Sequence, residues 1–351
     1  MTIGLLIILL MVFVLPFTVK IIERNLEYFL FIMGFFAVIV AGVLSKDLFV
    51  GILCDKMIYF IALAVLICGV LFRILKKRMK KIIARILKNM SLKLFVSLAI
   101  IILGLLSSLI TAIIASLVLV EIIEVLPLNR KDKIRVTVFA CFSIGLGAVL
   151  TPIGEPLSTI VISRLNKDFF FLLRELSVYI IPGIFAMGIF GAISIKRDSE
   201  VDENLNHTTS EEAIEEEREE EKVSTIFIRA LRIFVFIFAL EMLGAGFKSL
   251  INNYIFYFNS CFLYWINILS AILDNATLAA AEISPIMTVM QIKCILLGLL
   301  ISGGILIPGN IPNIITATEL KIKSREWAAV GVPIGLILMF IYFIIVFVIK
   351  I

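Results

Sequence analysis

Histidine and paired cysteines are scarce in this sequence, and their scarcity excludes several kinds of chemistry. The single histidine, His207, lies in an acidic polar stretch, so the chain has no HExxH zinc motif and no histidine-rich metal cage. Five dispersed cysteines without a CxxC pair imply neither a zinc site nor a disulfide framework. GxSxG and Walker-type loops are missing as well. We therefore expect a protein that is not an enzyme and has no cofactor.

Charged residues are also few. They make up 17% of the 351 residues, whereas hydrophobic residues make up 61%. A soluble chain of this length could not bury so much apolar surface, and several stretches reach the ~20 apolar residues that cross a ~30 Å hydrocarbon core. The sequence predicts an all-α polytopic protein of the cell membrane, in contact with the lipid bilayer and without a nucleic-acid partner. The candidate spans are 3–19, 26–44, 57–75, 136–163, 175–195, 225–247, 294–320 and 327–349.

Two further apolar stretches, 94–127 and 254–290, do not fit whole crossings. Two crossings and a turn need more than ~40 residues, which is more than either stretch has. Each carries polar residues near its middle, SSLIT at 107–111 and LDNAT at 273–277. A helical hairpin that enters the membrane halfway and returns fits both the length and the polar tip, provided that protein or a cavity surrounds the tip. We interpret both stretches as re-entrant hairpins.

The basic residues give this topology a direction. Residues 73–93 and 130–135 are rich in Lys and Arg and flank the first hairpin on one side. Most of the 32 Lys and Arg fall on this face, which the positive-inside rule makes cytoplasmic. Both termini then lie outside, and residues 198–224 form an acidic cytoplasmic linker. Two complete spans in place of each hairpin would give the same sidedness, so the charges do not decide re-entrance.

A helix break recurs in the two halves of the chain. Residues 150–162, LTPIGEPLSTIVI, interrupt an apolar run with prolines, a glycine and a glutamate, and residues 305–317, ILIPGNIPNIITA, interrupt another. A broken helix leaves N–H and C=O groups and helix-dipole ends facing the gap, where they suit an ion. Aligned at the break glycines and at the hairpin tips SLIT and DNAT, the halves give these pairs: Glu155 and Asn310, Ser158 and Asn313, Ser108 and Asp274, Thr111 and Thr277.

The order of span, hairpin, broken span and span occurs twice, and the topology inverts the second copy. Inverted repeats with a site at the midplane are the architecture of many secondary transporters. We divide the chain into an N-terminal transmembrane scaffold (1–56), a first inverted repeat (57–197, with hairpin 94–127 and broken span 136–163), the acidic linker (198–224) and a second inverted repeat (225–351, with hairpin 254–290 and broken span 294–320).

The breaks and the second hairpin tip resemble motifs of a known family. GEPLS and GNIPN look like the paired G-D-P-P-N motifs of the ion transporter superfamily, and DNATLAAA looks like the second tip of its NhaD-type sodium/proton antiporters. The ending GNIPNIITATELKIKSREWAAVG is similar to NhaD-type endings. The superfamily also holds arsenite efflux permeases and citrate and dicarboxylate carriers, and the chain most resembles an uncharacterised branch of predicted cation transporters.

This resemblance covers about residues 90–350 and has departures in the first half. Leu157 and Ser158 replace the second proline and the asparagine of the motif, and Leu109 replaces the asparagine of the first tip. These changes leave the first ion site with fewer ligands. The resemblance implies an elevator, in which the hairpins and broken spans move against a scaffold of the early spans, within a homodimer.

Two carboxylates and a set of neutral oxygens are the candidate ion ligands. A carboxylate at mid-depth costs ~2.5–3.5 kcal/mol on insertion scales, so Asp274 should face a partner or a wet cavity; its alternative role is to cap a half-helix. Glu155 is the second candidate, with an ion pair to Arg164 as its alternative. The other candidates, whose alternative is ordinary helix-end hydrogen bonding, are Asn275, Thr277, Asn310, Asn313, Thr151, Ser158, Ser108 and Thr111. A sodium ion would be held by Asp274, Asn275 and Asn310.

Two central carboxylates make the centre electronegative and oppose an anionic substrate. We expect a secondary active transporter, a cation (sodium)/proton antiporter, in which protons and small inorganic cations compete for the same carboxylates. Glu241 is a weaker candidate, for a proton path. The alternatives are a sodium-coupled symporter of a small anion (a carboxylate or oxyanion) and a non-transporting membrane sensor. In proteoliposomes an antiporter moves protons when sodium is added, a symporter also needs an anion, and a sensor moves neither.

Overall fold

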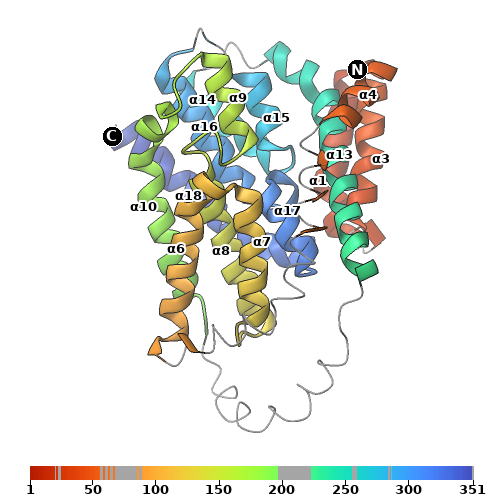
Figure 1. The fold of residues 1–351 in the computed structure, drawn as a ribbon. Helices are drawn as coiled ribbons and strands as arrows, with labels where there is room; N and C mark the ends of the chain where they lie inside the picture. The colour runs from red at the N-terminus through yellow and green to blue at the C-terminus, as the bar shows by residue number, and fades with distance from the viewer. Residues whose placement is uncertain are drawn as a thin grey trace.

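The computed structural model is all-helical over the residues that it describes, which include no strand. Figure 1 shows the helices gathered into one bundle, with α1, α3, α4 and α13 along one side of it. The structure describes residues 1–19, 21–22, 25–55, 58–59, 62–63, 66–67, 85–86, 89–196, 223–254, 259–283, 285 and 287–349. The expected span 57–75 lies mostly outside these ranges, and the acidic linker 198–224 lies outside them except for its last two residues.

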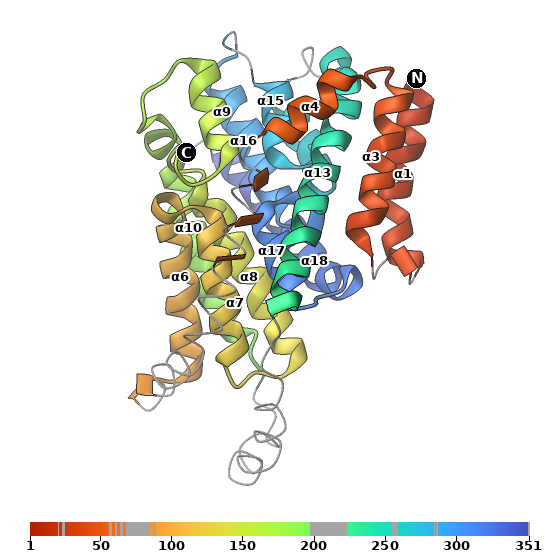
Figure 2. The ribbon, with the colours of Figure 1, turned by 45° about the vertical axis from the view of Figure 1, so that its right-hand side comes forward.

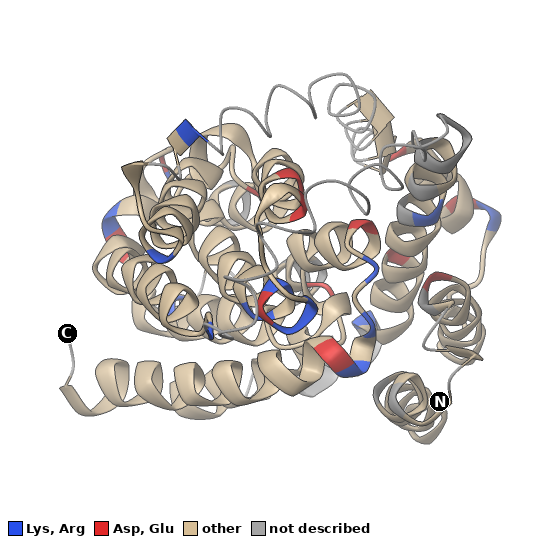
Figure 3. Ribbon diagram, turned by 90° about the horizontal axis from the view of Figure 1, so that it is seen from below, with Lys and Arg blue, Asp and Glu red and all other residues tan. Residues whose placement is uncertain are grey.

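Within the described ranges, four helices are long and apolar enough to cross a membrane. Many of their large apolar side chains are exposed, including Val178, Phe190 and Phe340, as expected of surface that faces lipid. Figure 3 shows the bundle end-on, with most of the ribbon carrying neither Lys and Arg nor Asp and Glu. The expected all-α membrane protein is therefore confirmed. The four helices are Leu92–Ile110, Phe171–Ile193, Ala230–Lys248 and Ser324–Ile349.

An N-terminal helical group packs around the long helix α13. Glycines let α3 and α13 approach closely: a Cβ on Gly34 would stand 2.9 Å from the Ala239 carbonyl oxygen, and one on Gly246 would stand 2.7 Å from the Ala37 carbonyl carbon. Figure 2 shows α4 running from the α1–α3 pair toward α13. This group consists of α1 (Thr2–Thr18), α3 (Leu26–Val40), α4 (Lys46–Cys54) and α13 (Val223–Tyr254).

The helix α4 did not appear among the expected spans. It begins because the side chain of Ser45 accepts a hydrogen bond from the Leu48 N–H at 3.1 Å and so caps the first turn. With nine residues it is too short to cross a membrane. It ends at Cys54, and Asp55 follows directly.

A second group of helices comes from the first half of the chain. Here α6 and α10 pack on α8, and Ser143 Oγ of α8 donates to the Ile100 carbonyl of α6 at 3.0 Å. At 19 residues α6 is long enough by itself to span, whereas α7 has 14. The group consists of α6 (Leu92–Ile110), α7 (Ala112–Val125), α8 (Arg130–Ala148), α9 (Pro156–Leu165) and α10 (Phe171–Ile193).

The third group comes from the second half. It contacts the second group most extensively where α17 packs on α7 and α15 packs on α9, and α16, α17 and α18 also contact α8. In Figure 1, α8 lies in the lower half and α9 in the upper half, whereas α16 lies above α17. The group consists of α14 (Ser260–Ile266), η2 (Asn267–Ala271), α15 (Asn275–Glu282), α16 (Val289–Gly303), η3 (Ile307–Gly309), α17 (Ile311–Glu319), α18 (Ser324–Phe343) and η4 (Ile344–Ile349).

Polar caps extend several helices beyond the apolar stretches that predicted them. The helix α8 begins at Arg130 rather than at residue 136, because Asn129 accepts a hydrogen bond from the Asp132 N–H at 2.9 Å. In the same way a capping box formed by Thr288 and Gln291 starts α16 ahead of residue 294. Hydropathy misses the first turn of α8 because the residues that form it are polar, whereas the first turn of α16 is mostly apolar and the sequence analysis had assigned its first two residues to the preceding hairpin.

Candidate functional site

Both broken helices stop and start again near the centre of the molecule. The first ends at Ala148 and resumes as α9 at Pro156, and the second ends at Gly303 and resumes as α17 at Ile311. A proline in the first turn of each new helix, Pro156 and Pro312, costs no hydrogen bond, since the N–H there has no helical partner. The two short connections leave backbone groups and helix ends facing each other across the centre.

The same position in each half bridges its break with a side chain. Ser158 Oγ donates to the carbonyl of Val149 at 3.1 Å and approaches that of Ala148 at 3.5 Å. Its counterpart Asn313 donates through Nδ2 to the carbonyl of Gly303 at 2.8 Å. Ala148 and Gly303 are separated along the chain by the same number of residues as Ser158 and Asn313. Both side chains therefore hold the shape of a break, and both are fully buried.

The two break glycines are required because the backbone folds back on itself at close range. A Cβ on Gly154 would overlap the Ala148 carbonyl oxygen. At the equivalent place, a Cβ on Gly309 would stand 2.5 Å from the Gly303 carbonyl oxygen. Real Cβ atoms do not approach oxygens this closely, so only glycine fits either position.

The junction of α6 and α7 is bonded to the first break. Thr111 sits between the two helices with φ 74°, and the next residue, Ala112, donates its N–H to the Gly154 carbonyl at 2.8 Å. Thr151 Oγ1 donates to the Ser108 carbonyl at 2.5 Å. These bonds hold the helix junction against the gap between α8 and α9.

Serines dock each helix pair onto its broken helix in the same way. Ser107 Oγ of α6 donates to the Ile144 carbonyl of α8 at 3.0 Å, and Ser270 Oγ of η2 donates to the Leu299 carbonyl of α16 at 3.3 Å. The acceptors Ile144 and Leu299 are separated along the chain by the same number of residues as the two break glycines, Gly154 and Gly309. Ser107 and Ser270 therefore make matching contacts in the two halves of the chain.

This equivalence changes the pairing of the tips. Thr111 follows Ser107 by as many residues as Asp274 follows Ser270. If the two serines are aligned, Thr111 therefore aligns with Asp274, whereas the sequence alignment had paired Ser108 with Asp274. Thr111 is the N-cap of α7, and Asp274 directly precedes α15 at Asn275, so each residue opens the second arm of its pair. Asp274 is thus the acidic counterpart of a threonine at a helix start.

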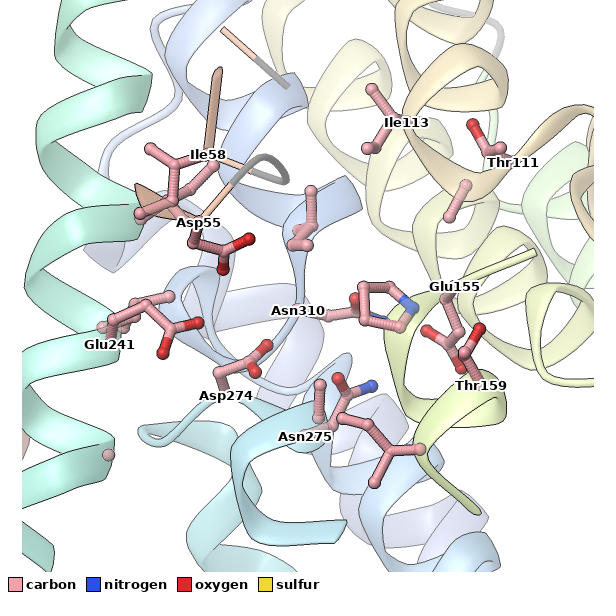
Figure 4. Close-up of a pocket in the computed structure, with 18 of the residues that line it drawn as sticks. Asp55, Ile58, Thr111, Ile113, Glu155, Thr159, Glu241, Asp274, Asn275 and Asn310 are labelled. Carbon is pink, nitrogen blue, oxygen red and sulfur yellow. The ribbon is translucent and has the colours of Figure 1, made fainter. Parts of the chain in front are cut away.

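A cavity of about 640 Å³ lies where the tips, the breaks and the N-terminal group meet. Figure 4 shows its acidic side chains, with Asp55, Glu241 and Asp274 toward α13 and Glu155 on the opposite side, beyond Asn310. Lys248 also lines it, together with apolar residues from α4, α9, α13 and α17. A cavity with this lining attracts cations.

Glu155 and Asn275 face each other across the lower part of this cavity (Figure 4). Glu155 is 6% and Asn275 3% exposed. Their side chains are close enough to interact, yet neither Glu155 Oε1 nor Asn275 Nδ2 makes a hydrogen bond of good geometry with a described residue. Asp274 is close enough for its charge to interact with that of Glu155. Buried polar atoms are normally satisfied, so these two atoms have room for a water molecule or a ligand.

Asn310 reaches the same cavity from the second break. Its Nδ2 lies against Gly145 of α8, where a Cβ would stand 2.8 Å away. A side chain at residue 145 would displace the amide, so this glycine makes room for Asn310 beside Asp274 and Glu155 (Figure 4). The second break thereby contributes to a site shared with the first half of the chain.

The structure brings five of the ten predicted site residues into the cavity lining and places others behind it. Ser158, Thr151 and Asn313 make the backbone contacts described above, and the hydroxyl of Ser108 donates to the Leu105 carbonyl at 2.9 Å. Thr277 lies in α15, but its side chain and that of Arg164 are outside the described ones. The five that line the cavity are Asp274, Glu155, Asn275, Asn310 and Thr111.

Sequence reasoning missed two charged residues of the cavity, Asp55 and Lys248. Asp55 follows a short helix that hydropathy does not reveal, and its position between apolar stretches is typical of a surface connection. Lys248 follows Glu241 by two turns of α13, so the pair shares one helix face, which is the signal that was available. Within the described part of the chain, no three His, Cys, Asp or Glu residues are placed to hold a metal ion together.

Together these features define a helical membrane protein with an acidic central cavity built from two broken helices. The chain matches the family DUF1646, described as a protein of unknown function, over residues 2–349, and it belongs to that family. No curated protein matches it.

Proposed function

We propose that this protein is a secondary active transporter that exchanges a monovalent cation, sodium, for protons. The observation that supports this proposal is the cavity at the two helix breaks. The carboxylates of Glu155 and Asp274 lie close enough there to interact, and the amides of Asn275 and Asn310 lie beside them. Carboxylate and amide oxygens are hard ligands that suit sodium. Protonation of the same carboxylates competes with cation binding, and this competition is the basis of exchange.

The ligand set favours a monovalent ion. Sodium would be held by Asp274 with the side-chain oxygens of Asn275 and Asn310, so one carboxylate balances one charge. A divalent cation is usually held by several carboxylates in direct contact with it, and among the described residues no three His, Cys, Asp or Glu side chains are placed to hold a metal ion in that way. An anionic substrate is opposed by the negative charge of the cavity walls.

Inverted repeats with re-entrant hairpins are part of the proposal. Two observations support them: equivalent residues make equivalent backbone contacts at both breaks, and the half-helix pairs α8–α9 and α16–α17 run through Figure 1 in opposite senses. Both tips then lie at the level of the breaks, near the membrane midplane. Alternating access would follow from movement of the hairpins and broken helices against α3 and α13, in an elevator within a homodimer.

The test is sodium-driven proton flux in proteoliposomes loaded with a pH dye, measured at several pH values. Asp274→Asn keeps the shape of the side chain and loses the titratable group, so we expect exchange at background level with unchanged thermal stability. Asp274→Glu should keep part of the activity with a shifted pH optimum, and Glu155→Gln should reduce exchange strongly. Wild-type exchange by Asp274→Asn, in protein that melts normally, would leave Asp274 with the capping role alone.

A further inference from the structure

The cavity has two acidic walls that come from different groups of helices. One wall carries Glu155 and Asp274, from the start of α9 and the start of α15, which belong to the broken helices and their packed pairs. The opposite wall carries Asp55, at the end of α4, and Glu241, on α13. In Figure 4 the carboxylates of both walls are turned into the space between them. The cavity thus lies at the interface between the N-terminal helical group and the rest of the bundle.

The two walls interact electrically. Glu241 is close enough to Asp274 and to Asp55 for their charges to interact with its own (Figure 4). Among the described residues of the lining, four are acidic and Lys248 alone is basic, and the Lys248 side chain is exposed. The partnerless Oε1 of Glu155, on a side chain only 6% exposed, also lines this space. Like charges gathered in one cavity favour a bound cation between them.

The cavity is too large for a sodium ion that has lost its water. At roughly 30 Å³ for each water molecule, 640 Å³ holds about twenty of them. An ion at Asp274 would therefore keep water on the side that faces Asp55 and Glu241. Those two carboxylates would reach such an ion through that water, or directly once the walls approach each other.

We propose that Asp55 and Glu241 are further cation-binding residues of this site, supplied by the N-terminal helical group, so that the monovalent cation is bound between the two walls. This inference rests on the proposed function for its ligand, a sodium ion. It assigns to Asp55 and Glu241 a share of the affinity for sodium, while Asp274 remains the residue where sodium and protons exchange. Sodium binding then draws the two walls together.

Direct binding tests this without transport. The melting temperature of the purified full-length protein is measured against sodium chloride concentration, with choline chloride holding the ionic strength constant. The apparent Kd is obtained by fitting the stabilisation to RT ln(1 + [Na⁺]/Kd). We expect Asp55→Asn and Glu241→Gln each to raise the apparent Kd about tenfold, since each removes one charge from the site. Asp47→Asn is the matched control, because Asp47 is an exposed acid on the same helix, α4, outside the cavity. It should leave the Kd unchanged.

An unchanged Kd in both cavity variants would overturn the inference, and so would an equal shift in the Asp47 control. If the neutral variants fail to fold, Asp55→Glu and Glu241→Asp decide, because they keep the charge and move it. A Kd shift of threefold or more supports the inference, and a smaller one refutes it. The proposed function fails separately, if wild-type protein gives no sodium-driven proton flux, because sodium binding is measured independently of exchange.

Discussion

Replacement of Gly154 by alanine should damage this protein far more than one methyl group usually does. The new Cβ would overlap the carbonyl oxygen of Ala148, and that oxygen belongs to a helix end that the Ser158 hydroxyl approaches from the other side. Ala112 also donates its N–H to the Gly154 carbonyl, and the N–H of Gly154 donates to the Thr151 carbonyl. The backbone of residue 154 is therefore held by hydrogen bonds on both sides. Relief of the overlap therefore requires the whole break to shift.

Overpacking of this kind costs about 1–3 kcal/mol. Such a cost lowers the population of the intact break by about 5- to 150-fold relative to distorted forms. We expect a melting temperature several degrees below that of the wild type, and sodium-driven proton flux reduced in proportion. The matched control is Gly51→Ala in α4, where nothing stands within 4 Å of a new Cβ. In that helix alanine should be neutral or slightly stabilising.

The assay is a thermal melt in detergent together with proton flux in proteoliposomes, on the same preparations of both variants. Equal melting temperatures for Gly154→Ala and Gly51→Ala would refute the geometry of the break. A lower melting temperature with full exchange would show that the break matters for folding but not for transport.

Three further predictions concern the rest of the chain. In a cysteine-free background, a cysteine placed within 200–220 should be labelled from the cytoplasm and one at Lys46 from outside; external labelling of 200–220 would contradict the inverted topology. Deletion of 203–219 should leave exchange largely intact, because we interpret that stretch as a linker, and its loss in well-folded protein would show a direct role. Asn313→Ala removes the hydrogen bonds to two buried carbonyls, at 2.8 and 2.9 Å, and should lower the free energy of unfolding by about 1–3 kcal/mol. Asn313→Gln should recover little of this stability, because its longer side chain does not fit. An unchanged melting temperature would show that these hydrogen bonds are not needed.

Several helices and both helix breaks could be predicted from the sequence because a membrane restricts the conformation of the chain so strongly. Long apolar stretches must form helices in lipid, since every backbone group needs a partner there, and helices α10, α13 and α18 follow from that requirement. A lone proline does not break an apolar helix here, since Pro182 lies inside α10, but prolines and a glycine clustered with a polar residue predicted the connections before α9 and α17 in the right places. Acidic residues among apolar ones need a polar setting, and Glu155 and Asp274 indeed line a cavity.

The tertiary structure decided which polar residues share that cavity and which hold the backbone. Sequence patterns do not distinguish an amide that faces a cavity from one that bridges a helix break, so Asn310 and Asn313 were both candidate ligands, although of the two only Asn310 lines the cavity. The pairing of Thr111 with Asp274 depends on which carbonyl each serine reaches, and short motifs without gaps cannot show this. Asp55 comes to the site because α4 lies next to α13, a contact between segments far apart in the chain that only packing determines.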